Sequence, residues 1–288
     1  MIGLVYKILA DKFWIMSDNT EYVCTAKGNL KEAGILVGDR VEFISEEKNI
    51  TNVLARKNSL IRPPIANIDK LIIVISAVPE PDFMIVDKLI LFSLGFGIEP
   101  IIVVNKMDIS EKLVKYVKFA YKDAVNGIFF TNAITGEGID ELKKIMKKSL
   151  CCFAGQSAVG KSALVNKIMQ KHSSNVGEIS IKNQKGKNTT RHCEIFFEDD
   201  IMITDTAGFT SLDEKLLPIS YFELPYYYHD FIKYLDKCKY KSCAHYNEKI
   251  EECAVKRAVI ENKIDKERFL RYKEIYKKLY EKWVKTHG

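Results

Sequence analysis

The 288-residue chain is 47% hydrophobic and 28% charged, with a formal net charge of +6. This composition excludes a disordered or low-complexity chain and predicts a globular protein of two or three domains. The small basic excess permits a nucleic-acid partner without requiring one, because many solvated surfaces carry such a charge.

The N-terminal residues show no basic stretch followed by an apolar core, as a secretory leader would. The longest aliphatic run, residues 71–75, is far too short to span a bilayer. We therefore expect a cytoplasmic protein with no membrane partner. In such a protein the seven cysteines are expected to be thiols or metal ligands.

Residues 1–62 alternate apolar and polar positions in short runs, which predicts an N-terminal β-barrel of about five strands. The strands are expected at residues 4–6, 13–16, 22–24 and 41–44, with turns at residues 18–19 and 38–39. An OB-like, RNA-binding barrel is favoured, and an SH3-like barrel stays open as an alternative. Arg62-Pro63-Pro64 then predicts a stiff linker.

Residues 63–212 are expected to form an α/β domain with a mostly parallel sheet, because apolar runs alternate with helical stretches. The strands are predicted at residues 71–76, 101–104, 128–131, 150–154 and 201–204, and the helices at 82–94, 110–121, 138–148 and 161–170. Residues 213–288 are predicted to be a helical domain that ends in one long charged helix over 255–282.

A glycine-rich loop between a predicted strand and a predicted helix has the pattern of a phosphate-binding P-loop. It reads Gly155-Gln156-Ser157-Ala158-Val159-Gly160-Lys161-Ser162, followed by Ala163. Glycines let successive N–H groups point at phosphates, and the helix N-terminus adds positive potential. Lys161 can reach the β- and γ-phosphates, and the Ser162 hydroxyl can bind Mg²⁺.

A guanine-binding motif, Asn105-Lys106-Met107-Asp108, follows an earlier predicted strand. The Asp108 carboxylate can accept hydrogen bonds from guanine N1 and N2, whereas adenine would leave it unpaired. Asn132 and Ala133, after the next strand, can offer a backbone N–H to guanine O6.

Two further segments are expected at the γ-phosphate. Asp205 would hold Mg²⁺ through water, and the Gly208 N–H would meet the γ-phosphate. Thr189 or Thr190 would complete the Mg²⁺ shell. We expect Lys161, Thr190 and Gly208 to act in catalysis. The guanine motif precedes the P-loop, the reverse of the usual order, which predicts a circularly permuted GTPase domain.

Three cysteines and a histidine lie close together in the last third of the chain: Cys238, Cys243, His245 and Cys253. Three thiolates and one imidazole form a closed tetrahedral shell for a structural Zn²⁺, whereas a catalytic zinc needs an open position. The alternative is that these cysteines are free or simply buried. Cys24, Cys151, Cys152 and Cys193 are expected to be core residues in strands.

The motif order, with a barrel before it and a cysteine cluster after it, resembles the ribosome-small-subunit-dependent GTPase A (RsgA) family. The likeness extends over nearly the whole chain, including residues 62–69, the two GTP-binding segments and the four zinc ligands. It implies an OB-fold domain, one structural Zn²⁺, Mg²⁺ with GTP, and GTP hydrolysis stimulated by the small ribosomal subunit. It also implies a role in the late maturation of that subunit through its rRNA. We expect a monomer.

The chain departs from this family's pattern at Ala158, Ala207 and Asn188, where glycine, proline and histidine are usual. Phe209, after Gly208, cannot orient the attacking water as a glutamine would. We therefore expect slow hydrolysis by the isolated protein. The alternative function is a nucleotide-gated rRNA-binding module with little hydrolysis.

Overall fold

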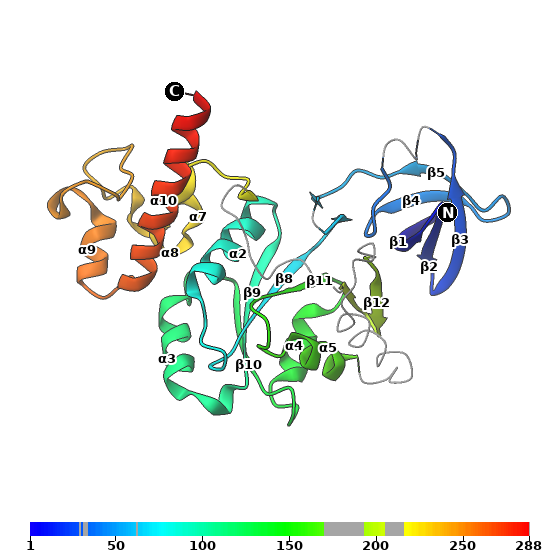
Figure 1. The fold of residues 1–288 in the computed structure, drawn as a ribbon, viewed down its shortest axis with the longest axis horizontal. Coiled ribbons are helices and arrows are strands. Elements are labelled where there is room, and N and C mark those ends of the chain that lie inside the picture. The colour runs from blue at the N-terminus through cyan, green and yellow to red at the C-terminus, as the bar shows by residue number, and fades with distance from the viewer. Residues whose placement is uncertain (29, 31–33, 62, 170–192, 205–215, 288) are drawn as a thin grey trace. The chain divides into compact units, whose positions relative to one another are not determined.

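The computed structural model describes residues 1–28, 30, 34–61, 63–169, 193–204 and 216–287 (Figure 1). Contacts between Cα atoms group the chain into two compact units. The first contains residues 1–72, 133–154 and 160–210, and the second contains residues 73–132, 155–159 and 211–288. The boundary falls inside one β-strand, which therefore belongs to both units.

The N-terminal residues fold into a closed barrel of five strands (Figure 1). These are β1 (Ile2–Leu9), β2 (Lys12–Ser17), β3 (Thr20–Ala26), β4 (Arg40–Ile44) and β5 (Asn49–Val53). Around the barrel their order is β1-β2-β3-β5-β4, with β3 and β5 parallel and the other pairs antiparallel. The predicted OB-like barrel is confirmed. Only β5 was missed, because it is rich in Asn and Thr.

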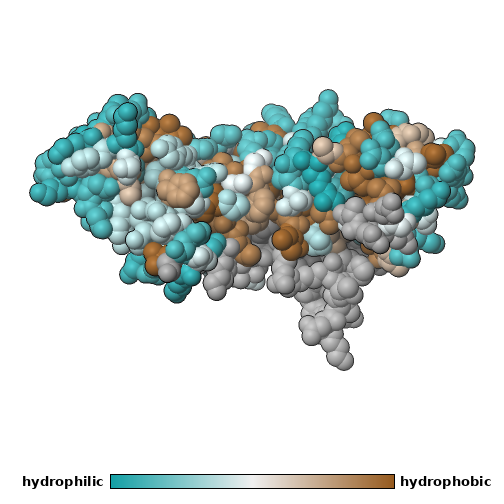
Figure 2. Space-filling model, turned by 90° about the horizontal axis from the view of Figure 1, so that it is seen from above, coloured by the Kyte–Doolittle hydropathy of each residue, from teal (hydrophilic) through white to brown (hydrophobic). Residues whose placement is uncertain are grey.

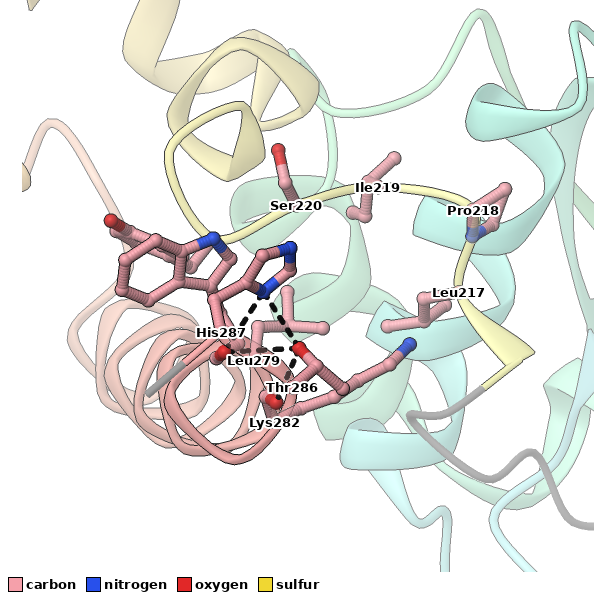
Figure 3. Close-up of a pocket in the computed structure, with 10 residues that line it drawn as sticks. Leu217, Pro218, Ile219, Ser220, Leu279, Lys282, Thr286 and His287 are labelled. Atoms are coloured by element: carbon pink, nitrogen blue, oxygen red, sulfur yellow. Dashed lines mark hydrogen bonds between the residues drawn. The ribbon is translucent and has the colours of Figure 1, made fainter.

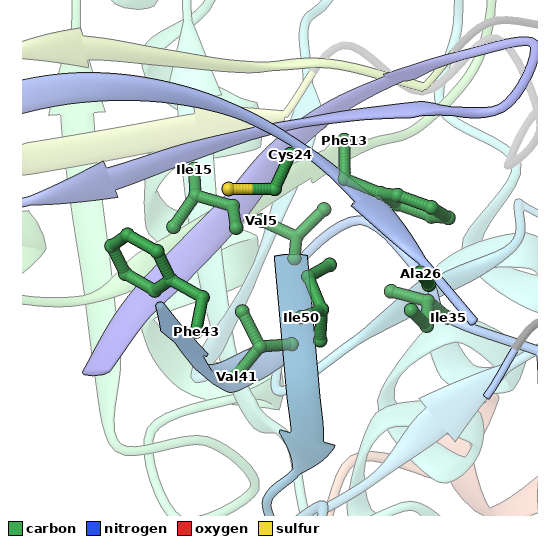
Figure 4. Packing of buried hydrophobic residues seen from close by; sticks show 9 residues of the cluster. All are labelled: Val5, Phe13, Ile15, Cys24, Ala26, Ile35, Val41, Phe43 and Ile50. Atoms are coloured by element: carbon green, nitrogen blue, oxygen red, sulfur yellow. The ribbon is translucent and has the colours of Figure 1, made fainter. Parts of the chain in front are cut away.

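The barrel interior is filled by side chains from alternate strand positions (Figure 4). Val5, Ile15, Val41 and Ile50 are fully buried, and Phe43 is 1% exposed. Each such side chain contributes about 1.5–3 kcal/mol when it leaves water. The alternation seen in the sequence therefore corresponds to an inward and an outward face.

The central region contains one six-stranded sheet in the order β10-β9-β8-β11-β13-β12. Its strands are β8 (Lys70–Ile75), β9 (Glu99–Asn105), β10 (Gly127–Thr131), β11 (Leu150–Ala154), β12 (Ile195–Glu198) and β13 (Ile201–Thr204). The pairs β9–β10 and β11–β13 are parallel, and β12 is antiparallel to β13. All five predicted strands are present. Cys193 is buried, as expected. It lies two residues before the first residue of β12, so the prediction that it belongs to a strand is wrong.

The four predicted helices of this region are also present, with shifted ends. They are α2 (Phe83–Gly95), α3 (Glu111–Ala120), α4 (Ile139–Met146) and α5 (Lys161–Ile168). The side chain of Asp82 accepts N–H bonds from Met84 and Ile85, and Ser110 accepts one from Leu113. These predicted first residues are therefore N-caps, and each helix begins one residue later.

Two short strands, β6 (Ser59–Leu60) and β7 (Ile65–Ala66), form a separate hairpin. The C-terminal part contains α7 (Leu224–Tyr227), α8 (His229–Leu235), α9 (Ala254–Ile260) and α10 (Lys266–His287). It also contains a short 3-10 helix, η4 (Ile250–Glu252). Helix α10 packs against α2 and α9 (Figure 1).

The prediction of one long helix over residues 255–282 is wrong, because the chain breaks between α9 and α10. Asn262 adopts a left-handed φ of 53°, and the N–H groups of Lys263 and Ile264 both bond to the Ala258 carbonyl. This arrangement ends α9. The Asp265 side chain then accepts the Arg268 N–H and caps α10.

Among the helices that the structure describes, none combines the length and the apolar character needed to cross a membrane.

Candidate nucleotide site and metal centre

The predicted phosphate loop follows β11 and leads into α5. Gly155 has a φ of +129°, and a Cβ added there would lie 2.2 Å from the Val74 carbonyl oxygen, so only glycine fits. Gly160 is the N-cap of α5 with a φ of 96°. Ser157 and Ser162 are exposed. The loop therefore has the backbone turn of a phosphate site, with polar side chains open to solvent.

Ala158 occupies a left-handed conformation with a φ of 64°. An L-residue there is less stable than glycine by roughly 1–2 kcal/mol. The substitution of alanine for the usual glycine is thus accommodated in the loop with some backbone strain.

The predicted guanine-binding motif lies where two parallel strands end together. β9 and β10 are paired in register at Asn105 and Thr131, so the residues that follow them emerge at the same edge of the sheet. The Asn132 amide donates a hydrogen bond of 2.8 Å to Asp108 Oδ1. Asp108 is exposed, so its carboxylate is accessible to a ligand.

The guanine motif and the phosphate loop are joined by direct hydrogen bonds. Asn105 Nδ2 donates to the Val159 carbonyl at 3.0 Å, and both residues are buried. Lys106 Nζ donates to the carbonyls of Ala158 at 3.1 Å and Val78 at 2.9 Å. Segments more than fifty residues apart are therefore held against each other.

Gln156 is a second connection of the loop, and sequence reasoning assigned it no such role. Its Oε1 accepts the Asp82 N–H at 2.9 Å, and its Nε2 donates to the Glu80 carbonyl at 3.3 Å. The loop is thereby fixed to the start of α2. No sequence signal could have identified these backbone partners, because they become neighbours only in the fold.

The other predicted nucleotide residues are placed as follows. Met107 begins η1 (Met107–Ile109), Ala133 lies in the turn after β10, and Lys161, Ser162 and Ala163 form the first turn of α5. The predicted magnesium and γ-phosphate residues Thr189, Thr190, Asp205 and Gly208 lie outside the described residues, as do Asn188, Ala207 and Phe209.

The four predicted metal ligands form one cluster in the C-terminal part of the chain. The ligand atoms of Cys238, Cys243, His245 and Cys253 all lie within 4.8 Å of one another. His245 Nδ1 lies 3.2 Å from the sulfur of Cys243, 3.3 Å from that of Cys253 and 3.7 Å from that of Cys238. A tetrahedral Zn²⁺ with ordinary bond lengths would hold nitrogen and sulfur roughly 3.6 Å apart.

The protonation state of His245 also suits a metal at this cluster. Burial raises the pKa of the Cys243 and Cys253 thiols and lowers the pKa of His245 to about 4. The imidazole is therefore neutral at pH 7, the form that binds metals, while buried thiolates need a cation to compensate their charge. Backbone N–H groups of Ala254 and Lys256 point at the sulfurs of Cys238 and Cys253. The cluster can therefore hold a thiolate-binding metal ion.

A polar cluster buried beneath α10 was not foreseen. Arg268 is 1% exposed and pairs with Asp87 of α2 at 3.2 Å and with Asp230 of α8 at 3.4 Å. Its guanidinium also lies over the Tyr228 ring, 4.6 Å from the centroid. Arg271 forms a second ion pair with Asp87. These contacts anchor the C-terminal helix to α2.

Comparison with protein families gives two matches. The model of a family described as RsgA GTPase matches residues 53–215, and a model described as 50S ribosome-binding GTPase matches residues 150–281.

Curated relatives resemble the chain along nearly its whole length. A protein of Caldanaerobacter subterraneus named small ribosomal subunit biogenesis GTPase RsgA is 37% identical, over 97% of this chain and 96% of its own. A protein of the same name from Ruminiclostridium cellulolyticum is 34% identical, over 96% of this chain and 93% of its own.

Two solved structures have a similar fold. YjeQ from Thermotoga maritima has a TM-score of 0.80 and 30% identity, covering 97% of this chain and 98% of its own. YloQ, described as a circularly permuted GTPase, has a TM-score of 0.77 and 26% identity, covering 98% and 95%. The permuted order read from the motifs is thus found in a solved relative.

Proposed function

Because this chain belongs to the RsgA GTPase family, we propose that it is a GTPase that binds the small ribosomal subunit and assists its late maturation. The subunit would stimulate hydrolysis. The names of the curated relatives support this assignment. The observation that carries it is the pair of contacts from Asn105 and Lys106 to the phosphate loop, beside the exposed carboxylate of Asp108.

In the proposed nucleotide site each segment has one role. Asp108 accepts the guanine N–H groups, and Asn132 orients it through the 2.8 Å hydrogen bond. The amides of the loop from Gly155 to Ala163 and the Lys161 ammonium bind the phosphates. Lys161 then stabilises charge that develops on the γ-phosphate, with Thr190 and Gly208 proposed beside it.

We propose two metals with different tasks. Ser162, Thr190 and, through water, Asp205 would hold the Mg²⁺ that accompanies GTP, and this ion would supply positive charge to neutralise the phosphates. One Zn²⁺ is held by Cys238, Cys243, His245 and Cys253. Four protein ligands leave no open position, so this zinc has a structural role.

We propose a separate function for each predicted domain. Residues 1–62 form an RNA-binding barrel, residues 63–212 the GTPase domain and residues 213–288 a zinc-binding helical domain. The barrel and the zinc domain would contact rRNA. We propose a monomer acting in the cytoplasm.

Binding experiments test the proposal in two steps. Titration calorimetry with Mg²⁺ should detect GTP and GDP binding, and the absence of heat with either nucleotide would remove the nucleotide site. Co-sedimentation should then show binding to small rather than large ribosomal subunits with a non-hydrolysable GTP analogue, and weaker binding with GDP. Preference for the large subunit would contradict the partner.

A second candidate function is a nucleotide-gated rRNA-binding module with little hydrolysis. The sequence observation in its favour is Phe209 after Gly208, together with Asn188 in place of histidine. GTP turnover at saturating small subunit separates the two functions. An acceleration supports the GTPase, whereas subunit binding without acceleration supports the module.

A further inference from the structure

The last turns of α10 carry a ladder of aromatic rings at one side of the helix. The Trp283 ring stacks on that of His287 at 5.2 Å and 16°, and on that of Tyr280 at 6.5 Å and 21°. Tyr221 meets the rings of Tyr280 and Trp283 edge-on, at 5.2 and 5.6 Å. We call these four residues the Trp283 ladder. Tyr280 is 45% exposed and Trp283 is 39% exposed, so the ladder is open to solvent.

A groove of about 250 Å³ runs beside the ladder, between α10 and the segment 217–221 (Figure 3). Leu217, Ile219 and Leu279 line it with apolar side chains, and Lys282 and Thr286 are polar lining residues. The segment is held in place by α2, since a Cβ at Gly95 would lie 2.6 Å from Pro218. The groove is therefore apolar inside, with a cation beside it.

The charge around the groove is positive. Residues 273–287 of α10 contain five lysines, at positions 273, 277, 278, 282 and 285, and two glutamates. Glu274 and Glu281 are ion-paired with Lys278 and Lys277. Figure 2 shows teal, hydrophilic side chains along the left end of the view, with pale and brown ones between them. Five lysines against two glutamates leave this stretch with a net positive charge, which an anionic partner complements and a purely apolar partner does not.

We propose that the groove and the Trp283 ladder form a stacking site for an unpaired base of single-stranded RNA. A nucleobase has the flat apolar face that matches an aromatic ring, and its phosphate supplies the charge that matches Lys282 and Lys285. A space of about 250 Å³ suits one base and not a folded peptide. This inference rests on the proposed function, since it names the feature of rRNA that the C-terminal part recognises.

Fluorescence can test the site directly, because the chain has only two tryptophans. In the Trp14→Phe variant of the full chain, Trp283 is the single reporter. Titration with a single-stranded oligouridylate should quench its emission saturably, because a stacked base contacts the indole. Heparin, a polyanion without bases, should bind without quenching. Equal quenching by heparin and oligouridylate, or RNA binding without quenching, would overturn the proposal.

Substitution gives the matching affinity test. Trp283→Leu should weaken oligouridylate binding roughly 5- to 150-fold, as expected for loss of one stacked base. Tyr226→Leu removes another exposed aromatic side chain, outside the ladder, and should leave affinity unchanged. Unaltered RNA affinity of Trp283→Leu, or an equal loss in both variants, would contradict the site. Metal content and GTP affinity should stay at wild-type levels, which shows that the variants are folded.

These experiments distinguish a failure of the stacking site from a failure of the proposed function. If wild-type protein binds the small subunit and Trp283→Leu binds it as tightly, the stacking site is wrong and the function stands. If wild-type protein binds GTP but neither subunit, the proposed partner is wrong, while quenching by oligouridylate would still establish the stacking site.

Discussion

At the scale of single residues, the predicted guanine motif combines Asp108, proposed to bind the base, with Lys106, which contacts the phosphate loop. The role proposed for Asp108 follows from its residue type and its place in the motif, so it could be predicted from the sequence. The contacts of Lys106 with Ala158 and Val78 could not be predicted, because they depend on where two loops meet. The motif therefore contains residues whose substitution should have different consequences.

Asp108→Asn should change which base is bound. The amide cannot accept both guanine N–H groups, so GTP affinity should fall about 10- to 150-fold, equivalent to about 1.5–3 kcal/mol for hydrogen bonds to a charged group. Affinity for xanthosine triphosphate should rise, because its base carries an oxygen where guanine carries an amine. Titration calorimetry with both nucleotides measures the switch, with the exposed Asp140→Asn as control. Unchanged GTP affinity would refute the base assignment.

Lys106→Met should weaken binding without changing the preferred base. The variant keeps the aliphatic stem but loses the two hydrogen bonds to the Val78 and Ala158 carbonyls. We expect affinity for GTP to fall about 5- to 30-fold, or about 1–2 kcal/mol, for this partly exposed group. The ratio of GTP to xanthosine triphosphate affinity should remain that of the wild type. A changed ratio would show that Lys106 selects the base rather than holding the loop.

At the scale of helices and strands, the elements that could be predicted are those with a clear local pattern of apolar residues. Strands buried on both faces appear as continuous apolar runs, so β8, β9 and β11 were identified. The break before α10 was missed because charged residues continue through it. This charged helix also carries a basic residue that is not solvated, because Arg268 is buried against Asp87. Asp87 and Arg268 are 181 positions apart in the chain, so their buried pairing leaves no pattern in the sequence.

Asp87→Asn should destabilise the protein strongly. Burial alone would lower the pKa of Arg268, but Asp230 and Asp87 raise it, so the guanidinium stays charged and needs its partners. Removing one carboxylate charge from this buried cluster should cost about 3–5 kcal/mol. Chemical denaturation monitored by circular dichroism measures this free energy of unfolding. Glu274→Gln breaks an exposed pair on the same helix and should cost less than about 0.5 kcal/mol. Equal effects would mean that Asp87 and Arg268 are not buried together.

Cys243→Ser should unfold the C-terminal part locally and spare nucleotide binding. The serine hydroxyl cannot replace a thiolate ligand, so bound zinc should fall from about one per chain toward zero. Limited proteolysis should then cut within residues 236–254 at native temperature. Cys24→Ala in the barrel is the control and should keep its zinc. Native protein with no zinc would remove the metal site altogether.

At the scale of the whole molecule, the architecture could be read because each domain has its own pattern and the motifs report their order. The two compact units could not be predicted from the sequence, because the boundary between them lies within β8, a strand of the GTPase sheet. The net charge is likewise a property of the whole molecule. A net charge of +6 predicts attraction to polyanions but not where the phosphates bind.

Two matched double variants separate local phosphate contacts from net charge. Lys282→Gln with Lys285→Gln removes the lysine that lines the proposed groove and the next lysine along α10, while Lys112→Gln with Lys115→Gln removes two from α3. Each phosphate contact contributes about 0.7–0.9 to the slope of log affinity against log salt concentration. The α10 variant should therefore lower the magnitude of that slope for small-subunit binding by about 1.4–1.8, while the α3 variant should leave it nearly unchanged. Co-sedimentation at several salt concentrations measures both slopes. Equal reductions would mean that attraction depends on total charge, and that α10 makes no specific phosphate contacts.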